Sequence, residues 1–267
     1  MSVFELTGKR ALVTGGARGL GAGMATALAA AGASVMIADV LKDVGEQTAA
    51  TITGTGGKAG FVQLDVTSDS DWDAAIAHTV AEFGGLDVVV NNAGIEITQL
   101  LVDTDADDMR KMFDVNVVGT MLGVKYGLRA MRPGGAAGNG GTIINIASVA
   151  ATIAFPAIAG YSASKSAIHR LTKVAAMESG QLGYGVRVNC IFPGLVATDM
   201  GIKLAVETAG LGLFESPDAA VGAVIGLTPS GRLGEVADMA DAVVFLASDA
   251  SRFVNGVGLP VDGGMGM

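Results

Sequence analysis

The stretch TGGARGLG, residues 14–21, decides the fold. It follows RALV, an apolar run typical of a buried strand, and opens GLGAGMATALAAAG, whose apolar residues have helical spacing. Gly15, Gly19 and Gly21 allow a sharp turn and let a pyrophosphate approach the helix N-terminus, where backbone N–H groups attract anions. A glycine cluster can also be a plain tight turn, and this spacing is wider than the usual GxGxxG fingerprint. The stretch therefore predicts a strand, a turn and a helix, with a nucleotide phosphate as the ligand.

The same alternation of strand and helix continues along the chain. Short runs rich in valine and isoleucine, each too short for a helix, recur at residues 10–15, 34–39, 60–65, 86–92, 141–148 and 186–192. Several lack strict alternation, as expected of strands buried on both faces. Right-handed crossovers then predict one α/β fold, a doubly wound parallel sheet of about seven strands flanked by helices, with the last strand within residues 254–264.

A lid is predicted late in the chain. Residues 194–231 break the alternation with scattered glycines and two prolines, before EVADMADAVVFLAS resumes a helix. No linker or shift in composition divides the chain, so residues 1–267 are predicted to form a single domain with this insertion covering the site.

Composition excludes several classes of partner. The formal net charge is -9, and no cluster of lysine or arginine exceeds two residues, which argues against nucleic acid and anionic membranes. No signal-peptide pattern occurs, and no segment approaches the ~20 apolar residues of a membrane span. Cys190 is the only cysteine, and His78 and His169 have no partners at ligand-like spacing. We expect a cytoplasmic protein with no metal site and with small-molecule partners.

Asp39 indicates which dinucleotide binds. It ends the second predicted strand, where its carboxylate can accept hydrogen bonds from the adenosine ribose hydroxyls and would repel a 2′-phosphate. Arg18, inside the glycine turn, could pair with such a phosphate, although a solvated turn residue explains it equally well. We give Asp39 more weight and predict NAD.

Together with later motifs, these residues resemble the short-chain dehydrogenase/reductase family. The order and spacing of TGGARGLG, NNAG at 91–94, Asn116, Ser148, YSASK at 161–165 and PG at 193–194 match that family over almost the full chain. The resemblance implies a Rossmann-like oxidoreductase that uses a nicotinamide cofactor. Within the family, GYSASK and GYGVRVNCIFPG are similar to bacterial hydroxysteroid and cyclic-alcohol dehydrogenases.

Four residues are predicted to be catalytic: Asn116, Ser148, Tyr161 and Lys165. Tyr161 and Lys165, at i and i+4, share one helix face. A free tyrosine with a pKa near ~10 is a weak base at neutral pH, so we expect the Lys165 ammonium to lower the pKa of Tyr161 and make it the general acid/base. Ser148 would bind the substrate oxygen. The resemblance implies that Asn116 holds a water linking the lysine to solvent, although it could simply satisfy a buried backbone group.

The predicted cofactor site combines the glycine turn, strand ends and the catalytic pair. Asp65 resembles the family residue beside the adenine ring, although acids at strand ends often cap the next turn. The predicted cofactor-binding residues are Gly15, Arg18, Gly19, Leu20, Gly21, Asp39, Asp65, Val66, Asn92, Ala93, Gly94, Tyr161, Lys165, Pro193, Gly194, Val196 and Thr198.

An apolar substrate is predicted from the lid and from VAATIAFPAIAG after Ser148, because few of their side chains are charged and neither contains an arginine to grip a carboxylate. We predict a bulky secondary alcohol or ketone: alicyclic, terpenoid, aryl or steroid. The predicted substrate-binding residues are Ser148, Ala150, Ile153, Phe155, Tyr161, Met200, Leu204 and Phe214, with Leu195, Val196, Leu211 and Leu213 as further candidates facing it. The apolar lid could instead pack on its own domain or on another subunit.

Alternative functions remain open at this stage. They are a 3-oxoacyl-thioester or sugar/polyol reductase of the same family, and a catalytically silent NAD-binding protein. The resemblance also implies that copies of this chain associate through two long helices. Apolar stretches with helical spacing, such as residues 108–128, could form such an interface. We therefore predict a homotetramer.

Overall fold

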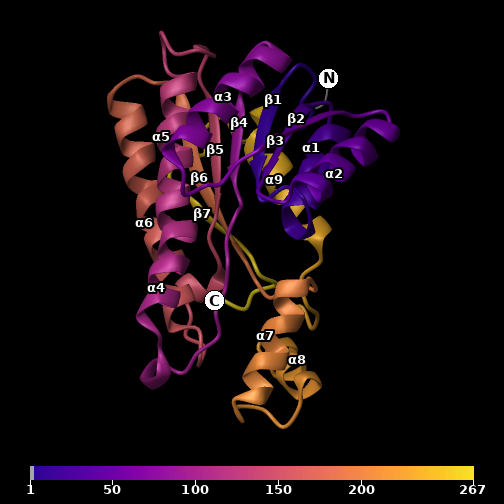
Figure 1. The fold of residues 1–267 in the computed structure, drawn as a ribbon, viewed down its shortest axis with the longest axis vertical. Coiled ribbons are helices and arrows are strands. Elements are labelled where there is room, and N and C mark those ends of the chain that lie inside the picture. Colours follow the sequence, from indigo (N-terminus) through magenta and orange to yellow (C-terminus); the bar gives the residue numbers. More distant parts are fainter. Residues whose placement is uncertain (1–2) are drawn as a thin grey trace.

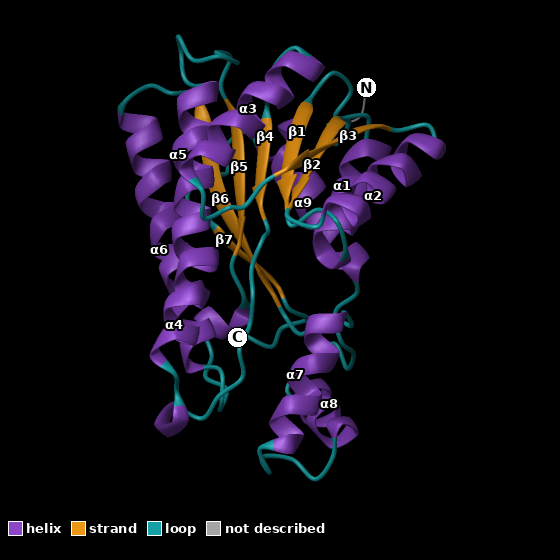
Figure 2. Cartoon of the chain, in the orientation of Figure 1, coloured by secondary structure: helices purple, strands orange, loops and turns teal. Residues whose placement is uncertain are grey.

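A computed structural model describes residues 3–267 and contains one seven-stranded sheet (Figures 1 and 2). Its strands are β1 (Arg10–Thr14), β2 (Ser34–Asp39), β3 (Lys58–Gln63), β4 (Val88–Asn91), β5 (Gly141–Ile146), β6 (Val186–Pro193) and β7 (Gly258–Val261). All neighbours pair in parallel, in the order β3-β2-β1-β4-β5-β6-β7. The strand order reverses between β1 and β4, which is where ligands bind in such sheets.

The predicted doubly wound α/β fold is confirmed. The helices are α1 (Gly19–Ala30), α2 (Lys42–Gly54), α3 (Asp69–Phe83), α4 (Ala106–Phe113), α5 (Gly119–Met131), α6 (Ala159–Gln181), α7 (Asp199–Gly210), α8 (Pro217–Gly226) and α9 (Val236–Ala247). The predicted lid segment folds into α7 and α8, which lie apart from the other helices at the lower end of the view in Figure 1. The first two residues of the predicted domain lie outside the described residues.

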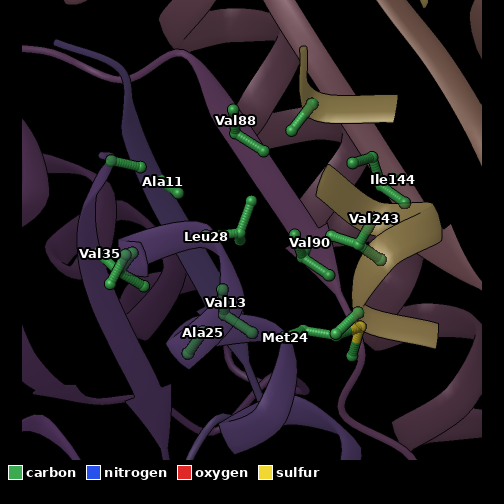
Figure 3. Packing of buried hydrophobic residues seen from close by; sticks show 14 of the residues in the cluster. Ala11, Val13, Met24, Ala25, Leu28, Val35, Val88, Val90, Ile144 and Val243 are labelled. Carbon is green, nitrogen blue, oxygen red and sulfur yellow. The ribbon is translucent and has the colours of Figure 1, made fainter. Parts of the chain in front are cut away.

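Buried side chains on both faces of the sheet hold the layers together. Alternate residues of β1 divide between two apolar clusters, with Ala11 and Val13 on one side and Leu12 on the other. The first cluster packs α1, α2 and α9 against the sheet, and Figure 3 shows Met24, Leu28 and Val243 among its members. The second packs α3, α5 and α6 on the opposite face. This burial explains why the strands lack polar alternation.

The described helices include no candidate for a membrane span. Within residues 3–267, no helix combines the length and apolar character that a span requires. Even the 23-residue α6, the longest helix in the described part of the chain, carries charged residues along its length.

Candidate active site

A pocket of about 570 Å³ opens at the carboxyl ends of the strands. Its walls come from the turns after β1 to β6, from the first turns of α6, and from α7 and α8. The volume suits a small organic ligand. All predicted cofactor-binding residues lie on this wall, so the fold brings together segments that are far apart in the sequence.

The glycine turn builds the floor of the pocket from backbone. Gly19 has a positive φ of 56° and open space where a Cβ would stand. A Cβ on Gly21 would lie 2.0 Å from the carbonyl oxygen of Gly15, so the helix approaches the turn more closely than any side chain allows. No side chain caps the N-terminus of α1, and its first turn contains no acidic residue. These features fit an anionic pyrophosphate held by backbone N–H groups.

Asp39 is buried at the end of β2 and lines the same pocket. Its carboxylate accepts hydrogen bonds from the backbone N–H groups of Ala17, at 3.0 Å, and Leu41, also at 3.0 Å. The negative charge is therefore fixed beside the glycine turn, and each oxygen keeps acceptor capacity for a ribose hydroxyl. Arg18 lies on the surface, where its guanidinium is 3.9 Å from Asp199 at the start of α7.

Two other predicted cofactor residues also support the turns around them. The side-chain amide of Asn92 donates to the carbonyl oxygens of Thr14, at 2.9 Å, and Gly15, at 3.1 Å, and so ties the turn after β4 to the glycine turn. Asp65 accepts hydrogen bonds from the N–H and hydroxyl of Thr67. Asp65 therefore caps its own turn, as the alternative interpretation proposed, while lying on the pocket wall.

The three side chains predicted for proton transfer converge on the pocket. Tyr161 and Lys165 lie one turn apart near the start of α6, with the lysine Nζ 5.5 Å from the centre of the tyrosine ring. Ser148 follows β5 and interacts with the tyrosine, and its Oγ also accepts a hydrogen bond from the N–H of Ala150 at 3.1 Å. The buried Lys165 Nζ donates to the carbonyl oxygen of Ile146 at 2.9 Å.

The electrostatics of this group differ from the prediction. Burial raises the pKa of Tyr161 to about 12, while Ser148 lowers it and the charge of Glu96 raises it further. Burial also lowers the pKa of Lys165 to about 8. The expectation that Lys165 brings the pKa of Tyr161 below 10 is wrong for this structure, because burial is the largest influence on the tyrosine hydroxyl and raises its pKa.

Asn116 lies behind the pocket wall, fully buried in a π-helical turn between α4 and α5. Its side chain bonds both backbone groups of Ile95, accepting from the N–H at 2.8 Å and donating to the carbonyl at 2.9 Å. It also donates to Ser164, whose hydroxyl donates to the carbonyl oxygen of Tyr161. Asn116 therefore satisfies buried backbone groups and ties the turn after β4 to α6.

The apolar side of the pocket is formed partly by the residues predicted for it. Ala150, Phe155, Met200, Leu204 and Phe214 line it, together with Leu195 and Val196. Within the described residues 3–267, Ile153, Leu211 and Leu213 do not reach the pocket, so these assignments were wrong. Ile153 lies two residues after the short 3-10 helix Val149–Ala151, and Leu211 is the C-cap of α7, beyond the last residue of that helix on the pocket wall, Thr208.

Sequence reasoning missed Glu96, which together with Asp39 makes up the buried acids on this wall among residues 3–267. It stands between two isoleucines in AGIEIT, directly after β4. An acid inside a short apolar stretch at a strand end is the signal that could have identified it. Within the same residues, no group of three or more His, Cys, Asp or Glu side chains could hold a metal ion.

The sequence of this chain is similar to those of known proteins over almost its full length. Residues 15–266 match the family model described as enoyl-(acyl carrier protein) reductase. Trans-4-hydroxycyclohexanecarboxylate dehydrogenase of Sinomonas cyclohexanicum is 41% identical over 262 residues, covering 96% of this chain and 92% of that protein. Cyclopentanol dehydrogenase of a Comamonas species is 36% identical, with 96% of each chain covered. The 3-alpha-(or 20-beta)-hydroxysteroid dehydrogenase of Mycobacterium tuberculosis is 38% identical, with 97% and 90% covered.

Solved structures agree with the fold. A short-chain type dehydrogenase/reductase from Mycobacterium marinum superposes with a TM-score of 0.88 at 34% identity, with 99% of each chain covered. A gluconate 5-dehydrogenase from Burkholderia cenocepacia, in complex with NADP and tartrate, gives a TM-score of 0.87 at 35% identity, with 98% of this chain and 96% of that chain covered.

Proposed function

The chain belongs to the short-chain dehydrogenase/reductase family of oxidoreductases, and on that premise we propose that it interconverts a bulky apolar secondary alcohol and its ketone, using NAD. The observation that carries the proposal is the convergence of Ser148, Tyr161 and Lys165 on one side of a largely apolar pocket. This places a hydroxyl donor, a transferable proton and a cation where a carbinol oxygen can bind.

The dinucleotide would lie along the turns after β1, β2 and β4. The N-terminus of α1 would hold its pyrophosphate, Asp39 the adenosine ribose, and Gly94 and Lys165 the nicotinamide end. When bound, the cofactor supplies the hydride acceptor for alcohol oxidation or the hydride donor for ketone reduction. Asp39 supports NAD because its fixed charge would face the additional phosphate of NADP.

Proton transfer falls to Tyr161. At neutral pH its hydroxyl is protonated and Lys165 is mostly an ammonium, given their pKa values of about 12 and about 8. In ketone reduction, Tyr161 donates its proton to the substrate oxygen, Ser148 holds that oxygen by a hydrogen bond, and Lys165 stabilises the phenolate that remains. Alcohol oxidation reverses the transfer and is favoured by rising pH. Asn116 positions α6 through Ser164.

The apolar pocket supports the substrate class. Phe155, Met200, Leu204 and Phe214 line the pocket, and the named substrates of three relatives are cyclic secondary alcohols. We place residues 194–231 over the substrate as a lid within a single domain, because α7 and α8 contribute pocket residues without joining the sheet.

Assembly as a homotetramer is supported by apolar side chains left exposed on two adjacent helices. Val118 ends the π-helical turn before α5, Met121 lies in the first turn of α5, and Val174 and Met177 lie on α6, next to it in Figure 1. Exposed apolar patches of this kind mark protein interfaces. Sedimentation showing only a monomer at micromolar concentration would contradict the tetramer. A cytoplasmic location is supported by Cys190, which is a buried free thiol.

The proposal is tested by mixing the protein with NAD and a panel of secondary alcohols and recording the absorbance of reduced nicotinamide. We expect turnover with alicyclic or steroid alcohols. Tight NAD binding without turnover across the panel would instead support a cofactor-binding protein that has lost catalysis.

A further inference from the structure

The end of the chain contributes a side chain to the pocket wall. Residues 262–267, which we call the tail, follow β7, and Figure 1 marks the C-terminus at the end of the sheet that faces α7. Within the tail, Met265 lines the pocket and is 8% exposed, whereas Met267 is 96% exposed. Neither the proposed proton transfer nor the proposed cofactor contacts use Met265, so its place on the wall needs its own explanation.

The carboxylate of Asp262 fixes the conformation of the tail. Its Oδ1 accepts a hydrogen bond from the N–H of Gly264 and its Oδ2 one from the N–H of Gly266, both at 2.9 Å. The N–H of Met265, between those two residues, donates to the carbonyl oxygen of Asp262 at 3.3 Å. The backbone on both sides of Met265 is therefore held by one residue, and this fixes the direction in which the methionine side chain leaves the chain.

The tail lies between the loop after β5 and the end of the lid. A Cβ on Gly266 would stand 3.3 Å from Cγ2 of Val149, the residue that follows Ser148. At the other end of the tail, the carbonyl oxygen of Gly263 accepts hydrogen bonds from the N–H and the hydroxyl of Ser230, both at 3.0 Å. The tail therefore connects the segment that carries Ser148 to the segment that carries α7 and α8.

Sheet topology places the tail far from the adenosine end of the proposed cofactor site. That end is built by the turns after β1, β2 and β3, whereas β7 is the edge strand on the opposite side of the sheet, next to β6. A methionine side chain is also apolar and flexible, and it fits irregular apolar surfaces better than the phosphates and hydroxyls of a dinucleotide. Met265 therefore belongs to the part of the wall that Phe155, Met200 and Phe214 also line.

We propose that Met265 is a specificity-determining residue, whose side chain limits the size of the cyclic alcohol that the pocket accepts. The inference rests on the proposed function and deepens it, because it assigns the selection among cyclic alcohols to a residue outside both the lid and the loop after β5. If the side chain occupies space that a larger ring system needs, shortening it should favour larger alcohols and enlarging it should exclude them.

The test compares kcat/KM, at saturating NAD, for cyclopentanol, cyclohexanol, 4-tert-butylcyclohexanol and a 3-hydroxysteroid. The variants are Met265→Ala, Met265→Leu and Met265→Trp. Met267→Ala and Met267→Trp are the matched controls, because Met267 is the same residue type in the same tail but lies exposed and outside the pocket wall. Ratios between substrates are used because a change in stability acts on all substrates alike and cancels in a ratio.

We expect Met265→Ala to raise the ratio of kcat/KM for the larger alcohols to that for cyclopentanol by about tenfold, the effect of one or two methylene groups in an apolar pocket. Met265→Trp should lower the same ratio by about tenfold or more. Met265→Leu conserves the volume and should stay within about threefold of the wild type. Both Met267 variants should keep the wild-type ratios.

Unchanged ratios in both Met265→Ala and Met265→Trp would overturn the inference and leave the proposed function intact, and a raised KM for NAD in these variants would then place the side chain against the cofactor. An equal shift in the Met267 variants would also contradict it, because the effect would belong to the tail as a whole. If Met265→Trp fails to fold, the Met265→Ala ratios decide. Turnover of no secondary alcohol by the wild type would overturn the proposed function itself and this inference with it.

Discussion

The two halves of the pocket are built by different means. The half proposed for the cofactor consists of turns at the ends of β1, β2 and β4, whose shape is fixed by glycines and by paired polar groups such as Asp39 and Asn92. The substrate half consists of side chains from the loop after β5 and from α7 and α8, with one buried carboxyl oxygen left unpaired. Substitutions in the second half can therefore change the shape and polarity of the pocket without altering the backbone turns of the first half.

The largest effect is expected where the two halves meet, at Tyr161. Tyr161→Phe removes the transferable proton but keeps the ring, so kcat should fall by about 10²–10⁴-fold while NAD binding persists. Tyr126→Phe is the matched control, because that hydroxyl bonds Asp69 away from the pocket. Steady-state kinetics test the prediction, and a variant with a tenth or more of wild-type kcat would remove Tyr161 from the mechanism.

The role of Asp39 in the half proposed for the cofactor is tested by the ratio of kcat/KM for NAD to kcat/KM for NADP. The wild type should prefer NAD, and Asp39→Asn should reduce that preference by about 100-fold, because the charge facing the additional phosphate is lost. Asp43→Asn, at an exposed acid in the first turn of α2, should not change the ratio. Equal use of both cofactors by the wild type would mean that Arg18 outweighs Asp39.

Backbone packing in the same half is tested by Gly21→Ala. The added Cβ would stand 2.0 Å from the carbonyl of Gly15, so we expect a loss of about 1–3 kcal/mol in the free energy of unfolding and weaker NAD binding. Gly222→Ala in α8 meets nothing within 4 Å and should be neutral or slightly stabilising. Denaturant unfolding measures both, and equal stabilities would argue against close packing at the turn.

The smallest expected effect is the dependence of kcat/KM for ketone reduction on pH. In the proposed mechanism, ketone reduction needs the Lys165 ammonium, whose pKa of about 8 in the free protein is set by burial. The kcat/KM for reduction should therefore be full below pH 8 and fall by about tenfold per unit as pH rises above it. Lys165→Arg, which keeps its charge, should lose this fall near pH 8. A wild-type profile that stays flat to pH 10 would contradict the assignment.

The same burial has a consequence for stability. The pKa of Lys165 in the folded state lies below its usual value of 10.5, so the unfolded chain binds more protons between pH 8 and 10.5. Stability should accordingly rise with pH across that window. Lys165→Met should raise the free energy of unfolding at pH 7, by about 1–3 kcal/mol, and this gain should shrink by pH 10. Thermal unfolding at the two pH values measures it.

The difference between the halves also explains what the sequence could predict. The glycine turn, Asp39 and the Tyr161–Lys165 pair depend on local spacing along one strand or helix, so they lie where expected. Ile153, Leu211 and Glu96 depend on how a loop or lid packs against distant elements, which local patterns do not encode. The pKa of Tyr161 was mispredicted for a related reason, because spacing reveals a charged neighbour but not the depth of burial.

The central claim is tested most directly by a comparison of kcat/KM, with NAD, between apolar cyclic or steroid alcohols and polar substrates such as polyols and 3-hydroxy acids. Because Phe155, Met200, Leu204 and Phe214 face the pocket, we predict a clear preference for the cyclic and steroid alcohols. A clear preference for polyols or hydroxy acids would contradict the account.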